Sequence, residues 1–262
     1  MFDINGKKRI VVKVGTSTLT HKTGRLNIRR MERLVKVLAD IQNSGRQIIL
    51  VSSGAVGLGM SKMSLGERPK ETAMKQACAA VGQCELMYMY DKLFGEYNIT
   101  VAQILLTRYI LDSPRKNNVE NTFERLIDRN VIPIVNENDT VAIDELELEF
   151  GENDSLAAHV GIFSRADMLI ILSDIDGLYD GNPRENPNAR LISEVHRIDE
   201  GIRSLAGGAG SGLGTGGMIT KINAAEIAMN AGMDMAILNG RNPAVLYDFF
   251  DGKKVGTVFS AE

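Results

Sequence analysis

The sequence has few of the residues on which metal centres and disulfide frameworks depend. Its 262 residues include two cysteines, three histidines and no tryptophan. The histidines, His21, His159 and His196, are scattered along the chain, without the spacing of a zinc site. Cys78 and Cys84 lie six residues apart in a predicted helix, where they face different directions. We therefore expect two buried thiols and no disulfide or protein-bound metal.

Excess positive charge and long apolar runs are also missing. The chain has 30 Lys and Arg against 33 Asp and Glu, which gives a net charge of −3, whereas a general electrostatic attraction to nucleic acid needs a basic excess. No apolar run approaches the ~20 residues of a membrane-spanning helix, and the run after Arg9 is too short for the core of a signal peptide. No G-x-S-x-G segment marks a serine hydrolase. We expect a cytoplasmic protein that binds neither nucleic acid nor membrane.

The composition that remains is typical of a globular chain, with 44% hydrophobic and 24% charged residues. Short runs rich in Ile and Val, mostly without polar alternation, are typical of strands that are buried on both faces. These predicted strands cover residues 9–14, 47–52, 99–106, 131–136, 168–173, 235–238 and 257–259. Residues 141–150 differ, because from 145 onward they alternate between apolar residues and glutamates, which predicts an amphipathic strand in a hairpin at the sheet edge.

Helical periodicity separates these runs. The predicted helices cover residues 28–44, 70–97, 115–129, 155–164 and 217–231. Repeated strand and helix patterns indicate an α/β fold, with a mainly parallel sheet of about eight strands between two helix layers. We expect a single domain over 1–262, with an N-terminal substrate half over about 1–165 and a C-terminal nucleotide half over about 166–262.

Lys13 is the first residue that points to chemistry, because it interrupts an otherwise apolar strand. A lysine is costly to bury unless it is paired or lies near an anion. The strand opens into Gly15, Thr16 and Ser17, and open α/β sheets bind ligands at the carboxyl ends of their strands. A lysine at this place is suited to a phosphate, although a lysine at a sheet edge would fit the same pattern.

Three further loops follow predicted strands or precede a predicted helix. Ser53 and Gly54 begin a small-residue loop whose free N–H groups are suited to an anion. Residues 136–139 (NEND) offer amides and carboxylates to a small polar ligand, where Asp139 can pair with an ammonium. Asn153 and Asp154 precede the helix over 155–164. The structural alternative for residues 136–139 is a capped surface turn, and the alternative for Asn153 and Asp154 is a helix cap.

The C-terminal half has two candidate nucleotide loops. Ser173 and Asp174 end a buried strand, and residues 207–221 (GGAGSGLGTGGMITK) leave many N–H groups free for phosphates, with Lys221 early in the next helix. The second segment is not a Walker A motif, because Thr220 and Ile222 flank the lysine. A G-x-G-x-x-G match begins at Gly212, but no strand immediately precedes it, so a dinucleotide-dependent dehydrogenase is only an outside alternative.

Together these motifs resemble the amino acid kinase family, and within it the members that phosphorylate the side-chain carboxylate of glutamate. The resemblance runs through essentially the whole chain. Its most specific segments are residues 11–17, 135–139, 151–154 and 211–218, with Lys221 three residues later. The family often has Thr and Asp where this chain has Ser173 and Asn182, and both replacements keep a polar group. The sequence stops soon after the kinase pattern, so we expect a short form without the C-terminal PUA domain of many members.

The resemblance implies transfer of a phosphoryl group from ATP, with Mg²⁺, to the γ-carboxylate of L-glutamate, the first step of proline biosynthesis. It implies catalytic roles for Lys13, Lys221 and Asp154, in which Asp154 holds the two lysines in place. Its implied glutamate-binding residues are Ser53, Gly54, Asn136, Asp139 and Asn153. Its implied nucleotide-binding residues are Lys13, Ser173, Asp174, Gly214, Thr215, Gly216, Gly217, Met218 and Lys221. No protein ligand for a metal is implied, because Mg²⁺ is expected to be coordinated mainly by the phosphates of ATP.

The resemblance also implies partners and leaves alternatives. We expect a homo-oligomer, possible transfer of the product to a glutamyl phosphate reductase, and competition by L-proline at the glutamate site, with residues 145–149 in a flap. A sister kinase for acetylglutamate, aspartate or a nucleotide is one alternative, which the NEND segment at 136–139 disfavours. A non-catalytic nucleotide sensor on the same fold is another, and the presence of both Lys13 and Lys221 disfavours it.

Overall fold

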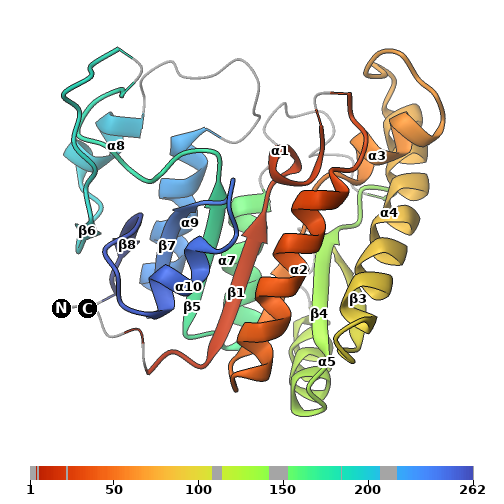
Figure 1. Cartoon of the computed structure of the whole chain (residues 1–262), viewed down its shortest axis with the longest axis horizontal. Helices are drawn as coiled ribbons and strands as arrows, with labels where there is room; N and C mark the ends of the chain where they lie inside the picture. The colour runs from red at the N-terminus through yellow and green to blue at the C-terminus, as the bar shows by residue number, and fades with distance from the viewer. Residues whose placement is uncertain are drawn as a thin grey trace.

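The computed structural model describes residues 4, 6–21, 23–107, 114–141, 153–183, 185–206 and 217–261. These residues form one eight-stranded sheet with the strand order β3-β4-β2-β1-β5-β7-β8-β6. Helices surround the sheet (Figure 1). The strands are β1 (Arg9–Val14), β2 (Gln47–Val51), β3 (Val101–Leu106), β4 (Ile132–Glu137), β5 (Met168–Ser173), β6 (Glu194–Val195), β7 (Asp234–Asn239) and β8 (Thr257–Phe259). The helices are α1 (Thr16–Leu19), α2 (Ile28–Asn43), α3 (Ala55–Lys62), α4 (Thr72–Gly95), α5 (Lys116–Asp128), α7 (Asn153–Ser164), α8 (Glu200–Ala206), α9 (Met218–Asn230) and α10 (Val245–Phe250).

The centre of the sheet is parallel and β1 lies near its middle. Lys13 of β1 pairs in register with Val51 of β2 on one side and with Ile171 of β5 on the other. The strands that follow β1 in the sequence lie first on one side of it (β2, β3 and β4) and then on the other (β5, β6, β7 and β8). Such a reversal of strand order is the place where open α/β sheets bind ligands. Only β8 runs antiparallel to its neighbour β7 among the described strand pairs.

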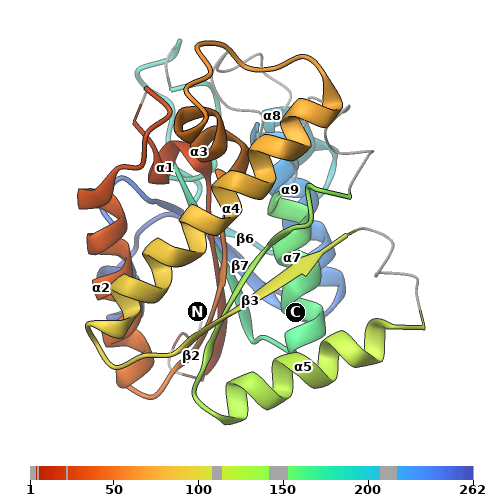
Figure 2. The ribbon, with the colours of Figure 1, turned by 90° about the vertical axis from the view of Figure 1, so that its right-hand side faces the viewer.

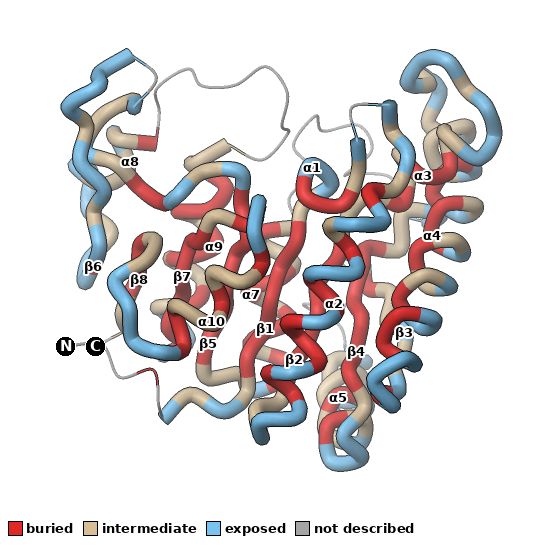
Figure 3. The backbone as a smooth tube through the Cα atoms, in the orientation of Figure 1, coloured by how far each residue is buried: buried red, intermediate tan, exposed pale blue. Residues whose placement is uncertain are grey.

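Two hydrophobic cores cover the two faces of the sheet, and Figure 2 shows the helix layers on either side of it. Helices α2, α4 and α10 pack on one face, and α5, α7, α8 and α9 pack on the other. Because strand side chains alternate, Ile10, Val12 and Val14 enter the first core while Val11 enters the second. Lys13 therefore shares the face of Val11, which is covered by α7 and α9. Buried residues concentrate in the central strands (Figure 3).

Helices α3 and α4 touch through their backbones where they cross. A Cβ atom at Gly82 would overlap the carbonyl oxygen of Ala55, and one at Gly59 would overlap that of Cys78. Only glycine allows two helix backbones to approach so closely at both positions. The crossing holds α4 directly against the segment that follows β2, which contains Ser53 and Gly54.

The predicted fold class is confirmed, and the boundaries of β1, β5 and β8 are those expected from the sequence. The short elements β6, α1, α3, α8 and α10 were not expected, because runs of two to eight residues carry too few positions to establish a period. Of the two expected buried thiols, Cys78 is buried and Cys84 is exposed, since they face different sides of α4. The predicted strand over 141–150 lies outside the described residues apart from Val141. None of the described helices is both long and apolar enough to cross a bilayer.

Candidate active site

Three charged side chains from three separate elements meet beside the central strand. Nζ of Lys13, on β1, lies 2.6 Å from Oδ1 of Asp154, in the first turn of α7. Nζ of Lys221, on α9, lies 3.2 Å from the other carboxylate oxygen, Oδ2. The two lysines thus share one carboxylate, although 208 positions separate them in the sequence (221 − 13). The predicted association of Lys13, Asp154 and Lys221 is what the structure shows.

All three side chains are almost completely buried, with exposed fractions of 8% for Lys13, 1% for Asp154 and 5% for Lys221. Burial alone would raise the pKa of Asp154, but the positive charges of Lys13 and Lys221 and hydrogen bonds from Lys13 and Thr220 outweigh it and hold the pKa well below its usual range. Two ammonium groups thus lie beside one carboxylate in a desolvated place. Ammonium groups in such a place are suited to an anionic group that enters from the carboxyl ends of the strands.

Thr220 completes the environment of Asp154. Its hydroxyl lies 2.9 Å from Asp154 Oδ2 and 2.8 Å from the carbonyl oxygen of Gly217. The side chain therefore joins the carboxylate to the start of α9, the helix that carries Lys221. The sequence did not lead us to expect this role, although Thr220 directly precedes Lys221 and could have been considered with it.

A second polar network lies next to the charged cluster, because Asn153 directly precedes Asp154 on α7. Nδ2 of Asn153 lies 3.1 Å from the carbonyl oxygen of Ser52, 2.7 Å from Oγ of Ser53 and 3.2 Å from Oδ1 of Asn136. The network joins the ends of β2 and β4 to the start of α7. Asn153 thus contacts two other predicted ligand-binding residues, Ser53 and Asn136.

Gly54 shapes the turn between β2 and α3. Its φ angle is +103°, in the left-handed region that disfavours side chains, and it precedes the first residue of α3. A Cβ atom here would approach Thr16 of α1 to 3.7 Å, so the loops after β1 and β2 lie side by side. Backbone N–H groups at the start of α3 have no partner within the helix and are available to an anion.

Asp139 lies in the turn that follows β4 and is partly buried. None of the described salt bridges includes it, and removal from water raises the pKa of Asp139 to about 6. A half-buried carboxylate without a cation is suited to an ammonium group on a ligand. Among the described hydrogen bonds, none joins Asp139 to the Asn136–Asn153 network.

The predicted nucleotide-binding residues are only partly described. Ser173, buried at the end of β5, and the exposed Asp174 follow the strand next to β1. Gly217 and Met218 mark the start of α9 beside Thr220. Gly214, Thr215 and Gly216 lie outside the described residues. Asp176, which accepts hydrogen bonds from Asn239 at 2.6 Å and Tyr179 at 3.0 Å, stabilises the loop after β5 and was not expected from the sequence.

In the described part of the chain, no three His, Cys, Asp or Glu side chains gather as metal ligands would.

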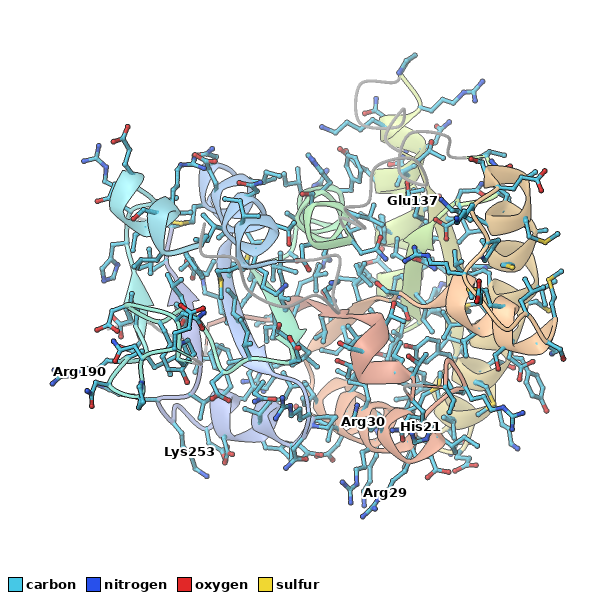
Figure 4. The ribbon with its side chains drawn as sticks, turned by 90° about the horizontal axis from the view of Figure 1, so that it is seen from above. His21, Arg29, Arg30, Glu137, Arg190 and Lys253 are labelled. Carbon is cyan, nitrogen blue, oxygen red and sulfur yellow. The ribbon has the colours of Figure 1, made fainter. Side chains whose placement is uncertain are left out.

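A cavity away from this site lies at the start of α2 and has a volume of about 500 Å³. It is lined by His21, Leu26, Asn27, Ile28, Arg29, Arg30, Arg33 and Arg241. Figure 4, seen from above, places His21, Arg29 and Arg30 on the side of the molecule away from Glu137, the residue that ends β4.

Comparisons with known proteins agree with this architecture. The family model described as "Amino acid kinase family" matches residues 8–239. A protein named glutamate 5-kinase from Clostridium perfringens is 52% identical over 262 residues, which cover 99% of this chain and 97% of that protein. A glutamate 5-kinase from Listeria innocua is 50% identical over 99% of this chain and 95% of its own length. The resemblance inferred from the motifs is confirmed.

Solved structures match the fold at low sequence identity. A carbamate kinase from Giardia lamblia bound to AMP-PNP superposes with a TM-score of 0.68 at 17% identity and covers 98% of this chain and 99% of its own. A UMP kinase from Ureaplasma parvum gives a TM-score of 0.65 at 13% identity, over 97% of this chain and 99% of its own. These matches establish the common fold and leave the substrate to other observations.

The shared carboxylate gives a stability prediction. Asp154→Asn removes the negative charge that the buried ammonium groups of Lys13 and Lys221 both contact, so we expect it to lower the free energy of unfolding by about 3–5 kcal/mol at neutral pH. Because the folded pKa of Asp154 lies below the ~3.9 of an unfolded aspartate, its contribution is complete above that value and is lost as the pH falls below it. Urea unfolding of both proteins at several pH values measures this. A difference that also shrank between about pH 5 and 8 would contradict the assignment.

Proposed function

The chain belongs to the amino acid kinase family, and we propose that it transfers the γ-phosphoryl group of ATP to the γ-carboxylate of L-glutamate. The products are L-glutamyl 5-phosphate and ADP. The observation that carries the choice of substrate is the identity of about one half with proteins named glutamate 5-kinase, over 99% of this chain. As the first step towards proline, this reaction places the protein in amino-acid biosynthesis.

The charged cluster matches the electrostatic demand of this reaction. Glutamate attacks with an anionic carboxylate, and the γ-phosphoryl group it attacks is also anionic. Lys13 and Lys221 approach Asp154 from opposite halves of the sequence, so their ammonium groups can stabilise the charge on the migrating group from two directions. No general base is required, because the γ-carboxylate, with an ordinary pKa of ~4.3, is already ionised at neutral pH. The carboxylate oxygen forms the new bond to phosphorus as the bond to ADP breaks.

The polar network beside the cluster is suited to glutamate. Asn153 directs its Nδ2 to Ser52, Ser53 and Asn136, which leaves its Oδ1 without a donor among the described residues and available to the substrate ammonium. Ser53 accepts a hydrogen bond from Asn153 and keeps its own hydroxyl proton for a substrate carboxylate. The N–H groups after Gly54 suit the same carboxylate. Asp139 supplies the negative charge that pairs with the ammonium.

We assign ATP to the carboxyl ends of the C-terminal strands. Ser173 and Asp174 follow β5, and Gly217 and Met218 lead into the helix that carries Lys221. The remaining predicted phosphate-binding residues are Gly214, Thr215 and Gly216. Because no cluster of carboxylates is present among the described residues, we expect Mg²⁺ to enter with ATP as part of that substrate. Homo-oligomer formation, transfer of the acyl phosphate to a reductase and a cytoplasmic location stay predictions.

Trapping of the product tests the proposed reaction. With ATP, Mg²⁺ and L-glutamate, the protein should release ADP, and hydroxylamine should convert the acyl phosphate into a hydroxamate in equal amount. Matched reactions contain aspartate, acetylglutamate, carbamate or UMP in place of glutamate. ADP release that is independent of glutamate, or faster with another acceptor, would reject the proposal.

The two lysines give the second prediction. Lys13→Ala and Lys221→Ala should each lower kcat by about a hundredfold or more, because a transition-state contact of this kind contributes roughly 3 kcal/mol. Lys253→Ala is the control, since that exposed lysine pairs with Asp248 on the surface. Circular dichroism confirms that each variant folds. A folded Lys13→Ala or Lys221→Ala variant with the kcat of the control would remove that lysine from the mechanism.

Asp139 predicts a pH dependence of substrate binding. Its carboxyl, with a pKa of about 6, must be ionised to attract the ammonium of glutamate. The KM for glutamate should therefore rise as the pH falls from about 7 to about 5.5, a range in which the ammonium and the γ-carboxylate of glutamate both stay ionised. Asp139→Asn should raise this KM roughly ten- to a hundredfold at neutral pH and abolish its pH dependence. The KM for ATP serves as the internal control, and an equal rise in both constants would place Asp139 outside the glutamate site.

A further inference from the structure

Gln83 has a buried side-chain amide that contacts the Asn136–Asn153 network. It is not one of the predicted glutamate-binding residues. It lies on α4, directly after Gly82, with an exposed fraction of 8%. Its Oε1 lies 2.9 Å from Nδ2 of Asn136. Within an otherwise largely apolar helix face, which also carries Leu86 and Tyr90, this side chain is the one that reaches Asn136.

Backbone groups fix the orientation of every amide in this network. Oδ1 of Asn136 lies 2.9 Å from the backbone N–H of Glu137, which can only donate. The opposite atom of Asn136 is therefore the nitrogen, and it donates to Oε1 of Gln83. At the other end, Asn153 contacts the carbonyl oxygen of Ser52, which can only accept, so its contacting atom is Nδ2. No amide can flip without placing two donors or two acceptors against each other.

This orientation leaves Nε2 of Gln83 buried and without a hydrogen-bond partner among the residues that the structure describes. A buried unpaired donor is costly, so an apolar residue of similar shape would be expected here if packing alone mattered. We propose that Gln83 is a positioning residue for glutamate binding, which sets the orientation of Asn136 and, through it, of Asn153. The inference rests on the proposed function, because it takes Asn136 and Asn153 as the residues that receive glutamate.

The position of Gln83 is itself rigidly set. The backbone contact of Gly82 with Ala55 anchors α4 against α3 one residue before Gln83. Seven residues after Gln83, the hydroxyl of Tyr90 lies 2.9 Å from Oγ of Ser52. Helix α4 therefore contacts both the end of β2 and the end of β4. The acceptor that Gln83 offers to Asn136 has little freedom to move.

Gln83→Met tests the proposal, because methionine keeps the length of the side chain and removes its strong acceptor. The KM for glutamate should rise about tenfold, while kcat and the KM for ATP should each change by less than about twofold. The melting temperature should stay close to that of the wild type, because the substitution removes one unpaired donor, Nε2 of Gln83, and creates another, Nδ2 of Asn136. A KM for glutamate equal to that of the wild type would overturn the proposal.

Gln42 offers a matched control on another helix. Its exposed fraction is 5%, its Nε2 lies 2.7 Å from Oδ1 of Asn130, and its Oε1 accepts the N–H of Ile48 at 2.7 Å. Both ends of Gln42 are satisfied, so Gln42→Met should lower the melting temperature and leave the KM for glutamate unchanged. A raised KM for glutamate in Gln83→Met alone, with a lowered melting temperature in Gln42→Met alone, would separate a positioning role from a structural one. If both variants changed stability alone, Gln83 would be a structural residue.

A double-mutant cycle with Asn136 separates failure of this proposal from failure of the site assignment. Asn136→Ala should raise the KM for glutamate, and adding Gln83→Met to it should have little further effect, because Gln83 acts through Asn136. Gln83→Glu, which retains an oxygen at the same place, should restore a KM within about threefold of the wild type. Independent, additive effects of the two substitutions would overturn the positioning role. An unchanged KM in Asn136→Ala would instead remove Asn136 from the glutamate site.

Discussion

The buried carboxylate of Asp154 is the group on which the arrangement of this protein depends. Two lysines of like charge would not remain 92% and 95% buried beside one another without a negative partner, and Asp154 contacts both. Lys13 comes from the central strand and Lys221 from α9, so the same carboxylate also ties together two elements from opposite ends of the chain. Two ammonium groups held together in this way are suited to the charge that develops in phosphoryl transfer.

Helix α7 connects this charged cluster to the Asn136–Asn153 network through two consecutive residues. Asp154 contacts the lysines, and Asn153 contacts Ser52, Ser53 and Asn136 at the ends of β2 and β4. A shift of the first turn of α7 would therefore move the two groups together. Such coupling is useful in a transfer reaction, because the attacking carboxylate and the migrating phosphoryl group must be positioned relative to each other.

Helix α4 supplies a second set of contacts to the residues around the Asn136–Asn153 network. Gly82 allows the close crossing with α3, Gln83 reaches Asn136, and Tyr90 reaches Ser52. The helix packs in the core through Leu86 and Phe94, while its buried polar side chains Gln83 and Tyr90 contact Asn136 and Ser52. Helix α4 therefore packs in the core on this face of the sheet and also contacts the candidate site residues.

The fold class and most of the long elements could be predicted from the sequence, because a strand such as Arg9–Val14 or a helix such as Ile28–Asn43 repeats its apolar period over enough residues to be recognised. The candidate site residues could be chosen in the same way, since a lysine within a buried strand and a glycine-rich loop before a second lysine are local signals. The partners of these residues became visible in the three-dimensional structure. Thr220 and Gln83 have no local motif that marks them, and Asp154 fits a helix cap as well as an ion pair by its sequence alone. Their roles depend on contacts between segments that are far apart in the sequence: 141 positions for Lys13 and Asp154 (154 − 13), 67 for Asp154 and Lys221, and 53 for Gln83 and Asn136. The crossing of α3 and α4 and the order of strands in the sheet bring these segments together.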